Sequence, residues 1–206
     1  MTNGPTRRQT LATALAASFA SLPGMAFAQS GPNTAEMSVG DENAPVTMVE
    51  YAMFTCPHCA TFHLETWPRI KENFVDTGKV RLVYREVYFN RASLWAGMIA
   101  RCASPDRYFG VVDLLYREQG EWLDGNDPEA MMRNLYGIGR QAGLTDAEMD
   151  SCMSDQSFAE ALVAEYQKNA QADGIDSTPS FTIDGEKVGN MSYAEFEAAL
   201  NEALGE

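Results

Sequence analysis

Two cysteines, Cys56 and Cys59, stand two residues apart, with Pro57 and His58 between them. An apolar, β-prone run, residues 46–51 (VTMVEY), comes before the pair, and a run with helical periodicity follows it. This order predicts that Cys56 lies at the start of a helix, where free backbone N–H groups and the helix dipole favour a thiolate. At such a position the first thiol of a Cys-X-X-Cys pair has its pKa lowered from about 8.5 to between roughly 3.5 and 7.5.

A low thiolate pKa has a redox consequence for the pair. A stable thiolate is a good leaving group, so an attacking thiol breaks the disulfide readily, and a stabilised reduced form makes the disulfide more oxidising. His58 adds an N–H donor and, when charged, a cation, while Pro57 fixes the first turn of the helix. We therefore expect the pair to donate its disulfide, with Cys56 forming the mixed disulfide with substrate and Cys59 resolving it.

Two other interpretations of the pair stay open at this point. A zinc site could draw on both cysteines together with His58 and His63, but strong zinc sites use four ligands, usually from two separated pairs. The only two histidines of the chain flank this one short segment. A structural disulfide is the other alternative, although so short a ring gains little from loop closure. We expect no metal and no other cofactor, and we expect His63 to be a residue of the helix face.

The segments around the pair predict a β-α-β unit. Strand 46–51 is followed by a helix from Cys59 to about residue 75, which Pro68 should kink, and then by a second strand over residues 79–87. Two strands joined through a helix pair in parallel.

Helical patterns then take over before strands return. Asp127 before a proline and Thr145 with a glutamate three residues later are N-cap signals. After these helices, the turn at Asp184-Gly185 predicts a hairpin, and residues 192–204 predict a final amphipathic helix. The helices predicted between the two sets of strands cover residues 92–103, 106–118, 128–142, 145–153 and 158–173.

Composition excludes some classes of function. The chain has 206 residues, and its length beyond the first 28 fits one well-packed domain or one domain with a large insertion. Those first 28 residues hold two of the 15 basic side chains and no acidic one, which leaves 13 basic and 29 acidic side chains and a net charge of −16. So acidic a surface repels phosphate backbones and anionic lipid, and we expect no nucleic-acid binding.

The first 28 residues have the layout of a secretory signal peptide. Arg7 and Arg8 form a short basic region, residues 11–22 form a weakly apolar region, and a small-x-small site ends at Ala28. The apolar run is too short for a membrane anchor. We therefore expect export and cleavage after about Ala28. The segment TRRQTL also resembles a twin-arginine signal, so both the Sec and the twin-arginine routes stay open.

The motifs FTCPHC and STPSF, together with the order β-α-β, helices, β-β-α, resemble the DsbA family of thioredoxin-fold oxidoreductases. The resemblance covers nearly the whole mature chain and implies an α/β, thioredoxin-like fold with an inserted all-helical domain. It implies that Cys56 is the nucleophile, that Cys59 is the resolving thiol, and that Pro57 and His58 tune the thiolate. Together with the composition of the N-terminal segments, it leads us to expect five parts: a signal peptide (1–28), a flexible leader (29–43), a first thioredoxin-like part (44–90), a helical insertion (91–174) and a second thioredoxin-like part (175–206).

The resemblance also assigns residues far from the motif. Pro179 matches the cis-proline that faces the disulfide, where it would expose the backbone of Thr178 to an extended substrate peptide. Thr178 departs from the valine of some oxidases of the family, and its hydroxyl could bond sulfur and change the redox poise. Glu50 resembles the buried acid that some members keep beneath the active site, where it could move protons to Cys59. The alternative for Glu50 is a solvated carboxylate at the end of a strand.

The remaining cysteines, Cys102 and Cys152, need a separate explanation. Some family members carry a second disulfide in the helical domain, and a bridge of this span could stabilise the protein by roughly 4 kcal/mol. An exported protein permits such a bridge. The alternative is two separate buried thiols, because free cysteine packs as a small hydrophobic residue.

The sequence thus predicts a periplasmic thiol:disulfide oxidoreductase that donates the Cys56–Cys59 disulfide to reduced or unfolded secreted proteins. The family implies a membrane oxidase like DsbB as its reoxidising partner, and we expect a monomer. Two rivals remain. The first is a reductase or isomerase on the same fold, although the short segment 29–43 supplies no dimerisation module for an isomerase. The second is a redox-inactive peptide-binding or chaperone module.

Overall fold

The computed structural model describes Met1, residues 34–124 and residues 127–206. Residues 2–28 of the predicted signal peptide and residues 29–33 of the predicted leader lie outside the described residues. Within the described part of the chain, none of the helices combines the length and the apolar character needed to cross a membrane.

In the described residues, five strands form one mixed sheet in the order β1-β3-β2-β4-β5. β2 and β3 are parallel, as the predicted β-α-β unit requires. β1, β4 and β5 each run antiparallel to their neighbours. The strands are β1 (Met37–Val39), β2 (Val46–Ala52), β3 (Val80–Glu86), β4 (Ser180–Ile183) and β5 (Glu186–Val188).

Strand β1 lies inside the segment predicted to be a flexible leader, so that prediction is wrong for residues 37–39. β1 pairs with β3 in the register Met37 to Tyr84 and Val39 to Leu82. The side chain of Met37 is 4% exposed. A three-residue strand gives almost no alternation to detect, and its stability comes from β3, which is about 45 residues away along the chain.

The helical run after the CPHC motif continues to Val75 and contains two π-helical turns. Its parts are α1 (Pro57–Thr61), η1 (Phe62–Thr66), α2 (Trp67–Ile70) and η2 (Lys71–Val75). Pro68 has no N–H to donate, and the wide turn η1 ends two residues before it. In that turn the N–H of Trp67 reaches back to the carbonyl of Phe62. The kink predicted from Pro68 therefore takes the form of a π turn just before the proline.

Six helices separate β3 from β4 in the described residues. Two predicted N-caps are confirmed: Asp127 accepts the N–H groups of Glu129 and Ala130, and Thr145 forms a capping box with Glu148. The short helix α5 was not predicted. The helices are α3 (Arg91–Cys102), α4 (Pro105–Arg117), α5 (Gln119–Trp122), α6 (Pro128–Gln141), α7 (Asp146–Met153) and α8 (Gln156–Ala172), and α9 (Tyr193–Leu204) follows the β4–β5 hairpin.

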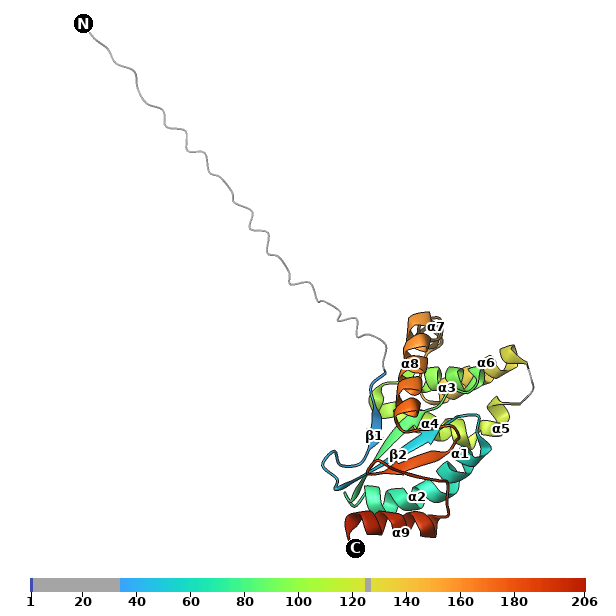
Figure 1. Cartoon of the computed structure of the whole chain (residues 1–206). Coiled ribbons are helices and arrows are strands. Elements are labelled where there is room, and N and C mark those ends of the chain that lie inside the picture. The colour runs from blue at the N-terminus through green and yellow to red at the C-terminus, as the bar shows by residue number, and fades with distance from the viewer. Residues whose placement is uncertain (2–33, 125–126) are drawn as a thin grey trace. The chain divides into compact units, whose positions relative to one another are not determined.

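The helices cover both faces of the sheet. After β1, the order of the elements along the chain confirms the predicted order β-α-β, helices, β-β-α. On one face, α2 and α9 lie side by side, as Figure 1 shows, and their apolar side chains pack with those of Met48, Leu82 and Phe181. The other face packs Val49 and Val83 against Ala170 of α8. A further core joins Ala52 and Phe54, at the end of β2, to α3, α4 and α6. The CPHC motif therefore starts where the sheet meets the helical insertion.

Candidate active site

Cys56 is the N-cap of α1, directly after the turn that follows β2. Its backbone is extended, with φ −86° and ψ 119°, and Pro57 occupies the first turn of the helix. The residue is 6% exposed. In its protonated form the Cys56 thiol donates a hydrogen bond to the carbonyl oxygen of Thr178, with 3.3 Å between sulfur and oxygen. The site therefore joins two segments that lie 122 residues apart in the sequence.

The surroundings of Cys56 lower the pKa of its thiol from 9.0 to about 5. The largest cause is a hydrogen bond with the side chain of Cys59. The side chain of Thr178 and the backbone N–H groups of Cys59 and His58 act in the same direction, and together these bonds outweigh the opposing effect of burial. Cys56 is therefore a thiolate at pH 7.

Cys59 has the opposite character. Its side chain is fully buried, and its sulfur accepts the backbone N–H of Met53 at 3.5 Å. Burial raises the pKa of the Cys59 thiol far above its ordinary value, and the hydrogen bond with Cys56 and the charge of Glu50 add to the rise. The two sulfurs are thus a thiolate and a thiol that keeps its proton.

Glu50 is a buried acid. It sits in the middle of the sheet, in β2, with Tyr84 of β3 on one side and Phe181 of β4 on the other. It is 1% exposed, and its Oε1 has no hydrogen-bond partner among the described residues. Burial raises the pKa of the Glu50 carboxyl to about 8, and the charge of Cys56 adds to the rise. The alternative of a solvated carboxylate is therefore wrong, and Glu50 is mostly protonated at neutral pH.

The loop before β4 brings Thr178 and Pro179 to Cys56. The peptide bond between Thr178 and Pro179 is cis. β4 begins at the next residue and pairs with β2, and its Ser180 stands opposite Tyr51. This pairing fixes the loop against the strand that leads to the CPHC motif, so the carbonyl of Thr178 faces the thiol.

The two histidines of the motif region lie in different environments. His58 is exposed, whereas His63 is 7% exposed and packs against Tyr116, with 4.8 Å between ring centroids. The Nε2 of His63 lies 3.6 Å from the carboxylate of Asp113. Burial nevertheless lowers the pKa of His63 to about 4, so its ring is neutral at pH 7. Over residues 34–124 and 127–206, no three His, Cys, Asp or Glu side chains gather as a metal site requires.

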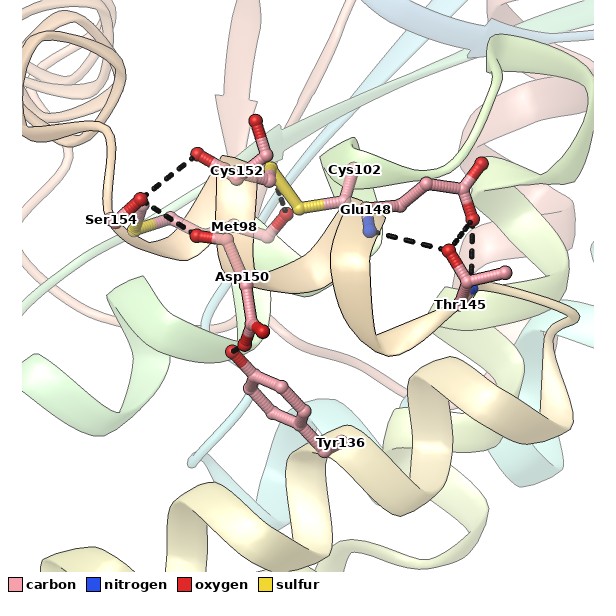
Figure 2. The surroundings of a disulfide bond; sticks show 9 residues. Met98, Cys102, Tyr136, Thr145, Glu148, Asp150, Cys152 and Ser154 are labelled. Carbon is pink, nitrogen blue, oxygen red and sulfur yellow. Dashed lines mark hydrogen bonds between the residues drawn. A yellow bond between two sulfur atoms is a disulfide. The ribbon is translucent and has the colours of Figure 1, made fainter.

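Cys102 and Cys152 are joined by a disulfide between the end of α3 and α7, as Figure 2 shows. Their Cα atoms lie 5.9 Å apart. The hydroxyl of Tyr136 in α6 donates to Asp150 at 2.8 Å, so α7 is also tied to α6. The bridge thus closes the insertion on itself, at the opposite end of α3 from the CPHC turn.

Sequence reasoning missed the polar side chains of the insertion that hold the turn between β2 and Cys56. Ser93 of α3 accepts the N–H of Phe54 at 3.2 Å. Asn90, the N-cap of α3, donates to the hydroxyl of Thr55 at 2.8 Å. Gln119 of α5 donates to the carbonyl of Phe54 at 2.8 Å. These residues belong to no motif, and only the packing of the insertion on the turn reveals them.

The chain is similar to known thioredoxin-fold and disulfide-forming proteins. A family model described as Thioredoxin matches residues 32–202. A Bacillus cereus protein named as a disulfide bond formation protein D is 41% identical over 173 residues, which cover 82% of this chain and 79% of that protein. The crystal structure of Wolbachia pipientis alpha-DsbA1 aligns with a TM-score of 0.76 at 25% identity, and the alignment covers 84% of this chain and 93% of that one.

A Rickettsia bellii protein, named as a protein-disulfide oxidoreductase, is 31% identical over 172 residues. The match covers 83% of this chain but 65% of the Rickettsia bellii protein, so the chain spans less than two thirds of that relative's length. The fold predicted from sequence, a thioredoxin-like fold with a helical insertion, is confirmed by the family model and by the alpha-DsbA1 structure.

Proposed function

The chain belongs to the DsbA family of thioredoxin-fold proteins, and from this premise we propose that it is a thiol:disulfide oxidoreductase that donates the Cys56–Cys59 disulfide to reduced secreted proteins. The observation that carries the proposal is the contrast between the two sulfurs. The pKa of Cys56 falls to about 5 while that of Cys59 rises. The thiolate at Cys56 stabilises the reduced form of the pair. A stabilised reduced form makes the disulfide more oxidising, which favours its donation to a substrate.

The proposed exchange has two steps. A substrate thiolate attacks Cys56 Sγ in the oxidised protein, a substrate–Cys56 bond forms, and the bond to Cys59 breaks. A second substrate thiolate then attacks the substrate sulfur of this mixed disulfide, and Cys56 leaves as a thiolate. The substrate gains one disulfide and the protein accepts two electrons. Of the two protons that the substrate thiols release, one is taken up by Cys59 and the other goes to solvent.

We assign Glu50 as the donor of the proton that Cys59 takes up. Cys59 leaves the first step as a thiolate in a fully buried position, where its charge is costly. Glu50 is also buried, and its pKa of about 8 makes it a proton donor at neutral pH. The charge of Cys56 raises the pKa of Glu50, and the charge of Glu50 raises the pKa of Cys59, which supports placing Glu50 close to both cysteines.

Pro57 and His58 are proposed to tune the thiolate, and Thr178 and Pro179 to receive the substrate. The Thr178 carbonyl accepts the Cys56 thiol at 3.3 Å in the free protein. An extended substrate segment that pairs with the backbone at Thr178 in β fashion would bring its own cysteine to Cys56. The Thr178 side chain, which already lowers the pKa of Cys56, would help to set the redox poise.

We also propose that the protein acts in the periplasm. The support is the signal-like sequence that ends at about Ala28, with export by the Sec or the twin-arginine route. A monomer with a DsbB-like membrane oxidase as its reoxidising partner fits the family. The Cys102–Cys152 bridge would be structural, because it lies at the end of α3 remote from the CPHC turn.

The test is oxidation of a reduced model protein with several thiols by the purified, oxidised chain, followed by loss of free thiols and recovery of the model protein's activity. The proposal expects one substrate disulfide for each Cys56–Cys59 pair consumed. Reduction of insulin by the dithiol form, with poor oxidation, would favour a reductase. An ordinary pKa at Cys56 together with no exchange would favour the redox-inactive peptide-binding module.

A further inference from the structure

The turn that carries Cys56 is held mainly by the helical insertion. The N–H of Phe54 donates to the hydroxyl of Ser93 in α3 at 3.2 Å. That hydroxyl in turn donates to the carbonyl of Val87 at 3.0 Å, which ties the turn to the segment after β3. Phe54 itself is fully buried in the core that joins the sheet to the insertion. The insertion therefore fixes the peptide unit two residues before the reacting sulfur.

Gln119 is the side chain of the insertion that bonds to Cys56 itself. Its Nε2 donates to the carbonyl of Phe54 at 2.8 Å and to the carbonyl of Cys56 at 3.0 Å. The Cys56 carbonyl also accepts the N–H of Ala60 at 3.2 Å. One amide group thus spans the turn, using both of its hydrogens.

Gln119 is firmly placed for this task. It opens the short helix α5, whose other end is Trp122. Trp122 is 1% exposed, and its Nε1 donates to the carbonyl of Leu115 in α4 at 2.7 Å. A buried tryptophan with its N–H satisfied is a strong anchor. The Gln119 side chain therefore comes from a rigid part of the insertion and reaches the turn across the boundary with the sheet.

We propose that Gln119 is a positioning residue for Cys56, through which the helical insertion sets the reactivity of the site; the inference rests on the proposed function. Its bonds fix the carbonyls of Phe54 and Cys56, and so fix the extended backbone that points the Cys56 sulfur at the free N–H groups of α1 and at Thr178. The Gln119 amide also donates to the Cys56 carbonyl oxygen, which is the negative end of that carbonyl's dipole. Both effects favour a negative sulfur, and neither requires Gln119 to touch it.

The test compares two variants at this position with a matched control. Gln119→Ala removes both hydrogen bonds, and Gln119→Glu puts a carboxylate against the two carbonyls in a side chain of the same length. Gln141→Ala is the control, because Gln141 is an exposed glutamine of the same insertion whose Nε2 bonds only to the Glu118 carboxylate at 3.0 Å. Two titratable groups coupled to Cys56 are the same in all three variants: Cys59, which lowers the Cys56 pKa, and Glu50, whose pKa the charge of Cys56 raises.

Two measurements on the full chain separate positioning from a purely structural role. The thiolate absorbance against pH gives the pKa of Cys56, and urea unfolding gives the stability of the oxidised and of the reduced form. We expect Gln119→Ala to raise the Cys56 pKa and to lower the equilibrium constant for oxidation of glutathione by the Cys56–Cys59 disulfide by up to about fivefold, which corresponds to the net contribution of one of the two hydrogen bonds that the variant loses. Gln119→Glu should act in the same direction and more strongly, and Gln141→Ala should change neither quantity.

A Cys56 pKa unchanged in both Gln119 variants would overturn the inference, whether stability falls equally in both redox states or does not fall. If one variant fails to fold, the other decides. Oxidation of a reduced model protein by the unaltered chain is measured separately. Failure of that reaction would reject the proposed function, whereas an unchanged pKa in the variants of an active protein would reject only the role of Gln119.

Discussion

Reduction of the Cys56–Cys59 disulfide should stabilise the fold at pH 7, the reverse of what most disulfides do. In the folded, reduced protein the pKa of Cys56 lies at about 5 against an ordinary 9.0. At pH 7 this preference for the thiolate contributes about 2.7 kcal/mol, which the unfolded chain lacks. The opposing effect is small, because closing a ring of four residues restricts the unfolded oxidised chain by about 1.8 kcal/mol in the loop-entropy estimate.

The difference between these contributions depends on pH with a definite sign. A depressed folded pKa gives stability that is fully present above the unfolded pKa and is lost as the pH falls through the folded one. Glu50 stays mostly protonated at pH 7 in the reduced protein, since burial, together with the charge of Cys56, raises its pKa to about 8. Solvent screening lowers the thiolate contribution somewhat. The free energy of unfolding of the reduced form should therefore exceed that of the oxidised form by about 1 kcal/mol at pH 7 and about 2 kcal/mol at pH 8. Near pH 6 the oxidised form should become the more stable one.

The assay is urea unfolding of the oxidised and reduced protein at pH 5, 7 and 8. It needs a Cys102→Ala/Cys152→Ala background, because reduction of that second bridge would mask the effect. A Cys59→Ser variant of this background forms no ring but keeps a hydroxyl that can donate to Cys56 in place of the Cys59 thiol, so it serves as the control for the thiolate contribution. An oxidised form that is clearly the more stable one at pH 8, or a difference that does not change with pH, would refute the reasoning.

The other predictions concern single side chains of the site. Cys56→Ser and Cys59→Ser should each abolish oxidation of a reduced model protein, because neither variant can form the disulfide that is donated. When the Cys59→Ser protein is mixed with a model protein that contains disulfides, its Cys56 thiolate should attack them and accumulate mixed disulfides visible on non-reducing gels, because no Cys59 thiol releases them; the absence of such species would contradict the roles assigned to the two sulfurs. His58→Ala should raise the Cys56 pKa by less than about one unit, because the backbone N–H of His58 that lowers this pKa is kept; the alkylation rate against pH measures it, and no change would count against tuning by the imidazole. In the oxidised protein, where Cys56 does not titrate, Glu50→Gln should remove the loss of stability between pH 5 and pH 8, which arises because the unfolded chain ionises this carboxyl while burial keeps it protonated in the folded protein; unfolding free energies that fall equally with pH in both proteins would contradict this.

The architecture was largely predictable because its signals are local. The strand before CPHC, the proline inside the following helix and the capping residues Asp127 and Thr145 each act within a few positions of the chain. β1 and α5 escaped prediction because they depend on distant partners. β1 is stabilised by the edge of β3, and α5 by burial of Trp122 on α4. Periodicity cannot report a contact of that kind in a segment of three or four residues.

The site divides in the same way. A helix start and a Cys-X-X-Cys spacing suffice to predict an acidic Cys56, but the largest single cause of its low pKa is the buried Cys59 thiol, whose burial comes from the packing around it. The contact between Cys56 and Thr178 likewise exists only because β4 pairs with β2. Sequence alone reached this contact through resemblance to a family and not through spacing. The role of Gln119 could not be predicted from the sequence, because a glutamine at the junction of two helices belongs to no motif.

Glu50 is the case in which the sequence held a usable signal. Five of the seven residues of β2, VTMVEYA, are apolar or aromatic, and they point to both faces of the strand. A strand that is apolar on both faces lies in the middle of a sheet with both faces covered. A carboxyl in such a strand has no route to solvent, and the structure places it between β3 and β4 at 1% exposure. A carboxyl buried there lowers the stability of the fold when it ionises. Its presence is therefore better explained by proton transfer to Cys59 than by folding, and Glu50→Gln separates the two explanations because it should stabilise the protein at pH 8 and slow the exchange.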